Sequence, residues 1–128
     1  MKQKVIIGLG SNWKSEVHIQ QANRLLMDYF EEIHFSEPVY TEPIGMSQSN
    51  LFLNQVAIAY TSRPIEEVKI ALKSMEKQLG RTPHSKQQGI IPIDIDLLQW
   101  NDQIFKPKDL EIAYIRQGID AISFGMLK

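Results

Sequence analysis

The 128-residue sequence contains no cysteine, no long apolar run and no excess of either charge. Without cysteine the chain has neither disulfides nor a thiol nucleophile, which fits a cytoplasmic protein. No apolar stretch approaches the ~20 residues of a membrane-spanning helix, so we expect no membrane association. A net charge of −1 gives no basic surface for nucleic acid. The length suffices for one hydrophobic core, so we expect a single domain over residues 1–128.

Hydrophobic periodicity predicts strands and helices in the order β-α-β-β-α-β. The predicted strands cover residues 5–10, 35–40, 51–62 and 91–100, and the predicted helices cover residues 15–32 and 65–79. Ser62 is the expected N-cap of the second helix, and residues 81–90 are expected to form a polar loop. Residues 112–127 form a weakly amphipathic, helix-like tail. This order is typical of an α+β, ferredoxin-like fold, in which both helices pack on one face of an antiparallel sheet.

Two carboxylates stand out in the last predicted strand, Ile91-Pro92-Ile93-Asp94-Ile95-Asp96-Leu97-Leu98-Gln99-Trp100. Side chains alternate between the faces of a strand, so Asp94 and Asp96 share one face, together with Leu98 and Trp100. Carboxylate oxygens two residues apart can converge on Mg²⁺, which binds one or two carboxylates plus substrate phosphates. The alternative is that both acids lie on the wet face of a half-buried strand.

The segment Gly8-Leu9-Gly10-Ser11-Asn12 follows the first predicted strand. It lacks the lysine of a P-loop and the third glycine of a dinucleotide-binding loop. A tight turn between strand and helix is therefore favoured over a phosphate-binding loop.

A cluster of cations precedes the acidic strand. Arg81, His84 and Lys86 lie close together in the polar segment that leads into Asp94. Cations beside a carboxylate pair are the arrangement expected for a polyphosphate with its metal. A solvated loop is the alternative.

Four stretches together resemble 6-hydroxymethyl-7,8-dihydropterin pyrophosphokinases of folate synthesis. They are Gly8-Leu9-Gly10-Ser11-Asn12; Thr41-Glu42-Pro43-Ile44-Gly45 with Phe52-Leu53-Asn54; Glu76-Lys77-Gln78-Leu79-Gly80-Arg81; and Ile93-Asp94-Ile95-Asp96-Leu97-Leu98. The resemblance covers residues 4 to 105 and implies a ferredoxin-like fold. It also implies transfer of pyrophosphate from ATP to the hydroxymethyl group of the pterin, with two Mg²⁺ ions.

The resemblance assigns roles to individual residues. Asp94 and Asp96 would hold both ions, and Arg81 would face the phosphates during catalysis. The nucleotide side would comprise Glu76, Arg81, His84, Lys86, Leu97 and Arg116. The pterin side would comprise Thr41, Pro43, Ile44, Phe52 and Asn54. We expect a monomer whose partners are the pterin and ATP, although a partner protein is not excluded.

The chain also departs from the family pattern. Where relatives carry further arginines, a tryptophan and a Pro-Arg pair, this chain has Pro83, Gln87, Gln88, Ile90 and Ile91. The C-terminal region is shortened as well. Each charge-assisted phosphate contact contributes on the order of 1.5–3 kcal/mol. These departures leave a second hypothesis open, a catalytically impaired relative that binds a pterin-like heterocycle without turning over ATP.

Overall fold

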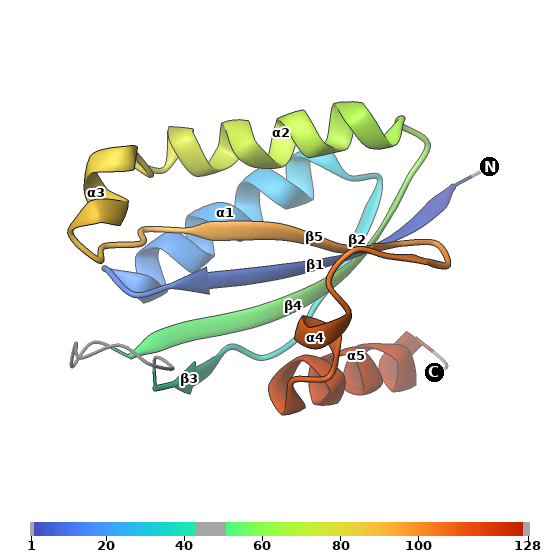
Figure 1. Ribbon diagram of the computed structural model, residues 1–128. Helices are drawn as coiled ribbons and strands as arrows, with labels where there is room; N and C mark the ends of the chain where they lie inside the picture. Colours follow the sequence, from blue (N-terminus) through green and yellow to red (C-terminus); the bar gives the residue numbers. More distant parts are fainter. Residues whose placement is uncertain (1, 43–50, 127–128) are drawn as a thin grey trace.

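The computed structural model describes residues 2–42 and 51–126 as one sheet flanked by helices (Figure 1). Its strands are β1 (Gln3–Ser11), β2 (Glu32–Phe35), β3 (Val39–Thr41), β4 (Phe52–Thr61), β5 (Asp94–Trp100) and β6 (Gln103–Ile104). Its helices are α1 (Ser15–Tyr29), α2 (Ile65–Gln78), α3 (Pro83–Gln87), α4 (Pro107–Leu110) and α5 (Ala113–Met126). None of these helices is long and apolar enough to cross a membrane.

The sheet has the order β2-β4-β1-β5-β6, and β3 also pairs with β4. All of these described pairings are antiparallel. The central strands β4, β1 and β5 follow the predicted split βαβ arrangement, so the predicted α+β class is confirmed. Acidic strand β5 lies directly beside β1, although more than 80 residues separate Gly10 from its partner Asp94 along the chain.

Helices α1 and α2 lie together on one face of the sheet (Figure 1). Alternate strand residues point toward them, as Val5, Ile7 and Ile95 do, and all three are fully buried. Leu26 of α1 and Leu72 of α2 complete the larger core cluster. At ~25 cal/mol per Å² of buried apolar surface, this continuous cluster supplies most of the hydrophobic stabilisation.

The opposite face carries α4 and α5, so the prediction that helices cover one face holds only for α1 and α2 (Figure 1). Ile115 and Ile122 of α5 pack on Ile6, Ile58 and Leu98 in a second, smaller cluster. The helix-like tail predicted from residue 112 onward thus folds back onto the sheet. It covers only part of that face, which leaves room for a cavity.

Three local predictions are wrong for identifiable reasons. The single strand predicted over residues 35–40 is two edge strands, because Pro38 cannot donate a ladder hydrogen bond between β2 and β3. The predicted loop over residues 81–90 contains α3, which begins with Pro83 and is capped by Thr82 and Ser85. Ser62 does not cap α2; instead its backbone N–H and hydroxyl donate to Glu31, at 2.8 and 2.9 Å.

A β-bulge changes the end of β5. Ile6 pairs with Gln99 whereas Ile7 pairs with Leu97, so Leu98 is an extra residue in β5. The extra residue shifts the alternation of faces. Trp100 consequently packs with the α1 and α2 cluster, and not on the face of Asp94 and Asp96 as predicted.

Candidate functional site

The two predicted acids lie on the sheet face that α5 leaves partly open. Asp94 and Asp96 point to this face from β5, and their partners on β1 are Gly10 and Gly8. A Cβ atom at Gly8 would lie 3.2 Å from Cδ1 of Leu98, closer than most packed carbon atoms. The glycines of β1 therefore leave this face of the sheet without side chains next to Asp94 and Asp96.

Glu76 of α2 brings a third carboxylate to the pair. Its Oε2 accepts a hydrogen bond of 2.7 Å from the backbone N–H of Ile95, and the residue is only 4% exposed. Among the described residues, β6 pairs with β5 only at Gln99 and Trp100, so the edge of β5 at Ile95 is open. Glu76 therefore accepts the hydrogen bond from the backbone N–H of Ile95 that a neighbouring strand would otherwise accept. One oxygen each from Glu76, Asp94 and Asp96 lie within 4.8 Å of one another.

Arg81 holds the acids from the side of α2. Its Nη1 donates to Oδ1 of Asp94 at 2.7 Å, to the carbonyl of Ile93 at 3.3 Å and to Oε2 of Glu76 at 3.4 Å. Gly80 directly before it has φ of +103°, a conformation that favours glycine. The chain therefore turns at the C-terminus of α2 and directs Arg81 toward the sheet. There its positive charge offsets the negative charges of the carboxylates.

Crowding of the carboxylates separates their proton affinities. Burial, together with the adjacent charge of Asp94, raises the pKa of Asp96 to about 7. Burial also acts to raise the pKa of Asp94, but hydrogen bonds from Asp96 and Arg81 outweigh it and lower that pKa. Burial raises the pKa of Glu76, partly offset by the Ile95 N–H and by Lys73. Near neutral pH, Asp94 holds the charge while Asp96 holds or shares a proton.

These residues suit a hard divalent cation. All three candidate donors are carboxylate oxygens, the ligand type that Mg²⁺ prefers. A cation would replace the proton that Asp96 holds and relieve the repulsion between the acids. The donor chemistry therefore fits magnesium, with Asp94 and Asp96 as the residues that would hold it.

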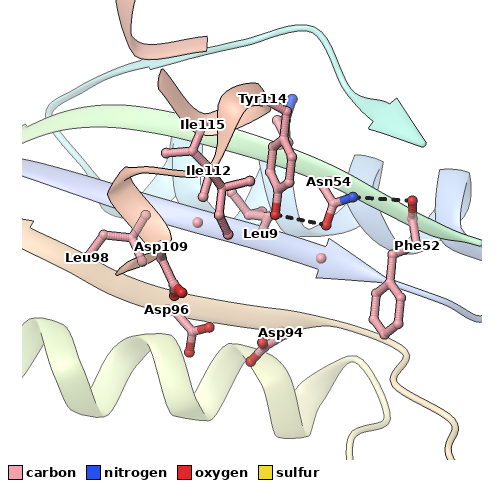
Figure 2. Close-up of a pocket in the computed structure, with 13 residues that line it drawn as sticks. Leu9, Phe52, Asn54, Asp94, Asp96, Leu98, Asp109, Ile112, Tyr114 and Ile115 are labelled. Carbon is pink, nitrogen blue, oxygen red and sulfur yellow. Dashed lines mark hydrogen bonds between the residues drawn. The ribbon is translucent and has the colours of Figure 1, made fainter. Parts of the chain in front are cut away.

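A cavity of about 180 Å³ lies beside the acids. Figure 2 shows Asp94 and Asp96 along one side of it, Phe52 and Asn54 along another, and Tyr114 reaching in from α5. An aromatic ring, an amide and a phenol around a small cavity suit a flat polar heterocycle. The acids thus lie where they can reach a substituent on such a ring.

Asn54 is fixed by a network of hydrogen bonds. Its amide nitrogen donates to Oγ1 of Thr41 at 2.6 Å and to the carbonyls of Val39 and Phe52, at 3.2 and 3.3 Å. Its oxygen accepts from the hydroxyl of Tyr114 at 3.3 Å. Thr41, Phe52 and Asn54, all predicted on the pterin side, therefore lie together. Since the amide nitrogen already has protein partners, the oxygen is the group that Asn54 presents to the cavity.

Tyr114 and Asp109 are among the cavity residues that the sequence did not predict. Tyr114 lies two residues before a predicted cation, Arg116, yet only the fold of α5 directs it into the cavity. Burial, together with Asp109, Asp94 and Asp96, raises its pKa, so the phenol stays a donor at neutral pH. Asp109 of α4 also lines the cavity. No spacing in the sequence connects α4 with the acidic strand.

The predicted cations do not all converge. Lys86 of α3 lines a second cavity that it shares with Arg81, whereas His84 is exposed on α3 and lines neither cavity. Arg116 is exposed on α5 and lines neither cavity as well. Leu97 packs against the larger core cluster, on the face away from the acids. Pro43 and Ile44 lie outside the described residues.

Asn12 ties the start of the acidic strand to β1. Its backbone N–H donates to the carbonyl of Ile91 at 3.0 Å, and its Oδ1 accepts from the N–H of Ile91 at 2.6 Å. Its amide nitrogen donates to the carbonyl of Gly89 at 2.8 Å. The tight turn predicted over Gly8-Leu9-Gly10-Ser11-Asn12 is wrong, because β1 continues as a strand through Ser11. Asn12 lies directly after β1 and fixes the approach of the chain to Asp94.

Comparison with known proteins shows the family of this chain. A family model described as 7,8-dihydro-6-hydroxymethylpterin-pyrophosphokinase (HPPK) matches residues 6–123. The chain belongs to this family. The HPPK match extends over β5, α4 and most of α5, so it includes both acids and Tyr114. The resemblance expected from the four sequence stretches is confirmed.

This member of the HPPK family covers different fractions of the length of its relatives. The 2-amino-4-hydroxy-6-hydroxymethyldihydropteridine pyrophosphokinase of Aquifex aeolicus is 32% identical over 111 residues, 86% of this chain and 69% of that protein. The folate synthesis bifunctional protein of Arabidopsis thaliana is 32% identical over 98 residues, 75% of this chain. Its mitochondrial counterpart in Pisum sativum is 34% identical over 98 residues. The chain spans 20% and 19% of these two plant proteins.

Proposed function

We propose that this HPPK family member transfers a pyrophosphoryl group from ATP to the hydroxymethyl oxygen of 6-hydroxymethyl-7,8-dihydropterin, a step of folate biosynthesis. The bond between the α–β bridging oxygen and the β-phosphorus breaks, and AMP leaves with that oxygen. The hydroxymethyl oxygen bonds to the β-phosphorus and loses its proton. The observation that carries the proposal is the convergence of Glu76, Asp94 and Asp96 beside the cavity of Asn54 and Tyr114.

Asp94 and Asp96 would hold two Mg²⁺ ions. When bound, the ions neutralise phosphate charge and orient the attacking and leaving oxygens. Arg81 would add positive charge beside the transferred group, since it already lies 2.7 Å from Asp94. Glu76 would keep β5 and Arg81 in place through its contacts with both. The protein's main contribution is then positioning and electrostatic stabilisation.

The heterocycle would occupy the 180 Å³ cavity. Phe52 and Tyr114 offer ring faces and edges for stacking, and the oxygen of Asn54 accepts a hydrogen bond from a ring N–H. Thr41 supports this role indirectly, because it holds the amide nitrogen of Asn54. Orientation of the flat ring would direct its hydroxymethyl group toward Asp94 and Asp96.

Residues 1–128 would act as one domain and one monomer in this reaction. In support, residues of a single chain line both the heterocycle cavity and the acid cluster. A partner protein is therefore not needed for these parts of the site. A cytoplasmic location stays a prediction from the sequence.

The test is AMP release in the presence of ATP, Mg²⁺ and 6-hydroxymethyl-7,8-dihydropterin. We expect the wild-type protein to release AMP only when the pterin is present, and the Asp94→Ala variant to release none above background. Calorimetry with the pterin and a non-hydrolysable ATP analogue, with and without Mg²⁺, measures the two halves of the site separately. Wild-type AMP release no faster than that of Asp94→Ala would refute the proposal.

One observation favours a second candidate, a relative that binds a pterin-like heterocycle without turning over ATP. His84 and Arg116 do not line either cavity that contacts the acid cluster, so they do not support phosphate binding there. Heat on addition of the pterin, but none with the nucleotide analogue and Mg²⁺, would identify this candidate. Heat with both ligands, together with AMP release, would exclude it.

A further inference from the structure

The acidic strand begins at one of the two acids. Asp94 is the first residue of β5, and the described pairing of β5 with β1 ends where Asp94 faces Gly10. Continuing that register by two residues would place Asn12 opposite Pro92, whose nitrogen has no hydrogen to donate. Among the described residues, β6 pairs only with the last two residues of β5, so the other edge of β5 is open at this end. The position of Asp94 therefore depends on what holds the chain just before it.

Asn12 holds that part of the chain. Its backbone N–H and its Oδ1 exchange two hydrogen bonds with the backbone of Ile91, at 3.0 and 2.6 Å, as a residue pair of an antiparallel ladder would. Its amide nitrogen donates to the carbonyl of Gly89 at 2.8 Å, and the N–H of Gly89 donates to the carbonyl of Lys86 in α3. Asn12 is only 5% exposed. Its carboxamide thus joins β1 both to the start of β5 and to the end of α3.

The same arrangement closes the other end of the two strands. Asn101 follows β5 directly, as Asn12 follows β1, and its backbone N–H donates to the carbonyl of Lys4 at 2.7 Å. Its Oδ1 accepts from the N–H of Lys4 at 2.9 Å. Asn101 is exposed, and it lines neither the heterocycle cavity nor the second cavity beside Arg81. The two asparagines make the same pair of strand-closing bonds, but Asn12 makes them next to the acids and Asn101 does not.

The chain between Ile91 and Asp94 is short and buried. It consists of Pro92 and Ile93, both of which have buried side chains. The carbonyl of Ile93 accepts a hydrogen bond from Nη1 of Arg81 at 3.3 Å. Because this buried segment has little freedom, the bonds that Asn12 makes with Ile91 set where Asp94 enters β5. A shift of about 1 Å in a catalytic group can lower a rate on the order of 100-fold.

We propose that Asn12 is a positioning residue, which holds Asp94 in place for metal binding in the transfer reaction. The inference rests on the proposed function. Asn12 lines neither cavity, so it acts through Ile91 and Gly89 and not by contact with a substrate. Both ends of its carboxamide are used, since the oxygen bonds to Ile91 and the nitrogen to Gly89. Alanine removes both bonds, whereas serine keeps a single polar side-chain atom, one covalent bond closer to the backbone.

The test measures the binding of Mg²⁺ alone by calorimetry, and kcat and KM for AMP release. We expect Asn12→Ala to weaken Mg²⁺ binding about tenfold and to lower kcat on the order of 100-fold, because Asp94 is no longer held in place. The KM for the pterin should stay within about twofold of the wild-type value, since the cavity of Phe52 and Asn54 is not altered. Asn12→Ser should lie between Asn12→Ala and the wild type.

Asn101→Ala is the matched control, because it removes the same kind of strand-closing bond away from the acids. Asn101 has φ of +52°, a conformation that alanine adopts less readily than asparagine, so this variant should also lower the midpoint of thermal unfolding. It should nevertheless bind Mg²⁺ and release AMP as the wild type does. A purely structural role of Asn12 would lower the unfolding midpoint in the same way and leave Mg²⁺ affinity unchanged.

Wild-type Mg²⁺ affinity in folded Asn12→Ala, or in Asn12→Ser if the alanine variant does not fold, would overturn the inference. An equal loss of Mg²⁺ affinity in Asn101→Ala would overturn it as well. The Mg²⁺ titration needs no turnover, so the two proposals can fail separately. Absence of wild-type turnover, with Mg²⁺ binding still weakened only at position 12, refutes the proposed function alone. Wild-type turnover, with unchanged kcat and Mg²⁺ affinity in Asn12→Ala, refutes the positioning role alone. Circular dichroism of each variant checks that it is folded.

Discussion

The two faces of the sheet differ in chemistry although the same central strands supply both. Toward α1 and α2, β1 and β5 present Val5, Ile7 and Ile95, which form a continuous apolar core. Toward α5, the same strands present Gly8, Gly10, Asp94 and Asp96 at one end, and Ile6 and Leu98 of the smaller apolar cluster at the other. One face is sealed and supplies stability. The other face is covered by helices over only part of its length and keeps a cavity beside crowded carboxylates. This arrangement lowers the free energy of unfolding but leaves the carboxylates available for catalysis.

The largest effect that distinguishes the faces should come from Asp96→Asn. Loss of this carboxylate should lower kcat for AMP release by on the order of 10³-fold, because it removes a ligand for the charge-neutralising cation. The midpoint of thermal unfolding should stay the same or rise, because a buried carboxyl next to Asp94 is removed. Asp102→Asn, in the exposed turn after β5, is the control and should change neither value. Marked unfolding of Asp96→Asn would show that this face also carries stability.

Leu72→Ala should show the reverse behaviour. Leu72 is 2% exposed in the larger core cluster, so its truncation should lower the free energy of unfolding by about 2–5 kcal/mol. Ile122→Ala in the smaller cluster should cost about 2 kcal/mol, since residues around α5 have more freedom to relax. Urea unfolding measures both, and AMP release per folded molecule should be unchanged for Leu72→Ala. An equal or larger cost for Ile122→Ala would break the distinction between a sealed and a partly sealed face.

Gly118→Ala tests how closely α5 must approach the sheet. A Cβ atom at Gly118 would lie 2.4 Å from Cγ1 of Val56 on β4, too close for packed carbon atoms. We expect a loss of about 1–3 kcal/mol in the free energy of unfolding, and weaker pterin binding because α5 carries Tyr114. In the same helix, Gly125→Ala meets nothing within 4 Å and should be neutral or stabilising by up to about 1 kcal/mol. Equal effects at the two glycines would argue against close docking of α5.

The smallest effect concerns the end of the α1 and α2 layer. The backbone N–H and hydroxyl of Ser62 lower the pKa of Glu31, and the hydroxyl of Thr61 adds to this. Because the folded pKa is depressed, its contribution to stability is present at neutral pH and is lost as the pH falls through the lowered value. Glu31→Gln should therefore flatten the fall in the unfolding midpoint between about pH 5 and 3. Identical slopes in wild type and variant would contradict this role.

Much of the fold follows from local signals in the sequence. Period-two alternation places Asp94 and Asp96 on one face, and the helical stripe of α2 ends at Gly80 as predicted. Helix α3 was missed although its signals are present, since Thr82 and Ser85 form a capping box around Pro83. Trp100 was placed on the wrong face because a bulge of one residue is not visible in an alternating pattern.

The site itself is predicted less completely. Thr41, Phe52 and Asn54 lie together as expected, because one strand pairing joins β3 to β4. Tyr114 and Asp109 were not predicted, because their positions depend on how α4 and α5 fold back over the sheet. Lys73 and Lys77 look like ordinary solvent-exposed positions of an amphipathic helix. Only the orientation of α2 along β5 brings them beside Arg81.

The sequence by itself determined the order of β1, α1, β4, α2 and β5, the shared face of Asp94 and Asp96, and membership of the HPPK family. These depend on period, spacing and residue type, which are local properties of the chain. The tertiary structure alone decided that Glu76 joins the acids, that Tyr114 lines the cavity and that lysines gather beside Arg81. Each of these depends on packing between elements distant in the chain, where burial and charge are set by neighbours that no local pattern specifies.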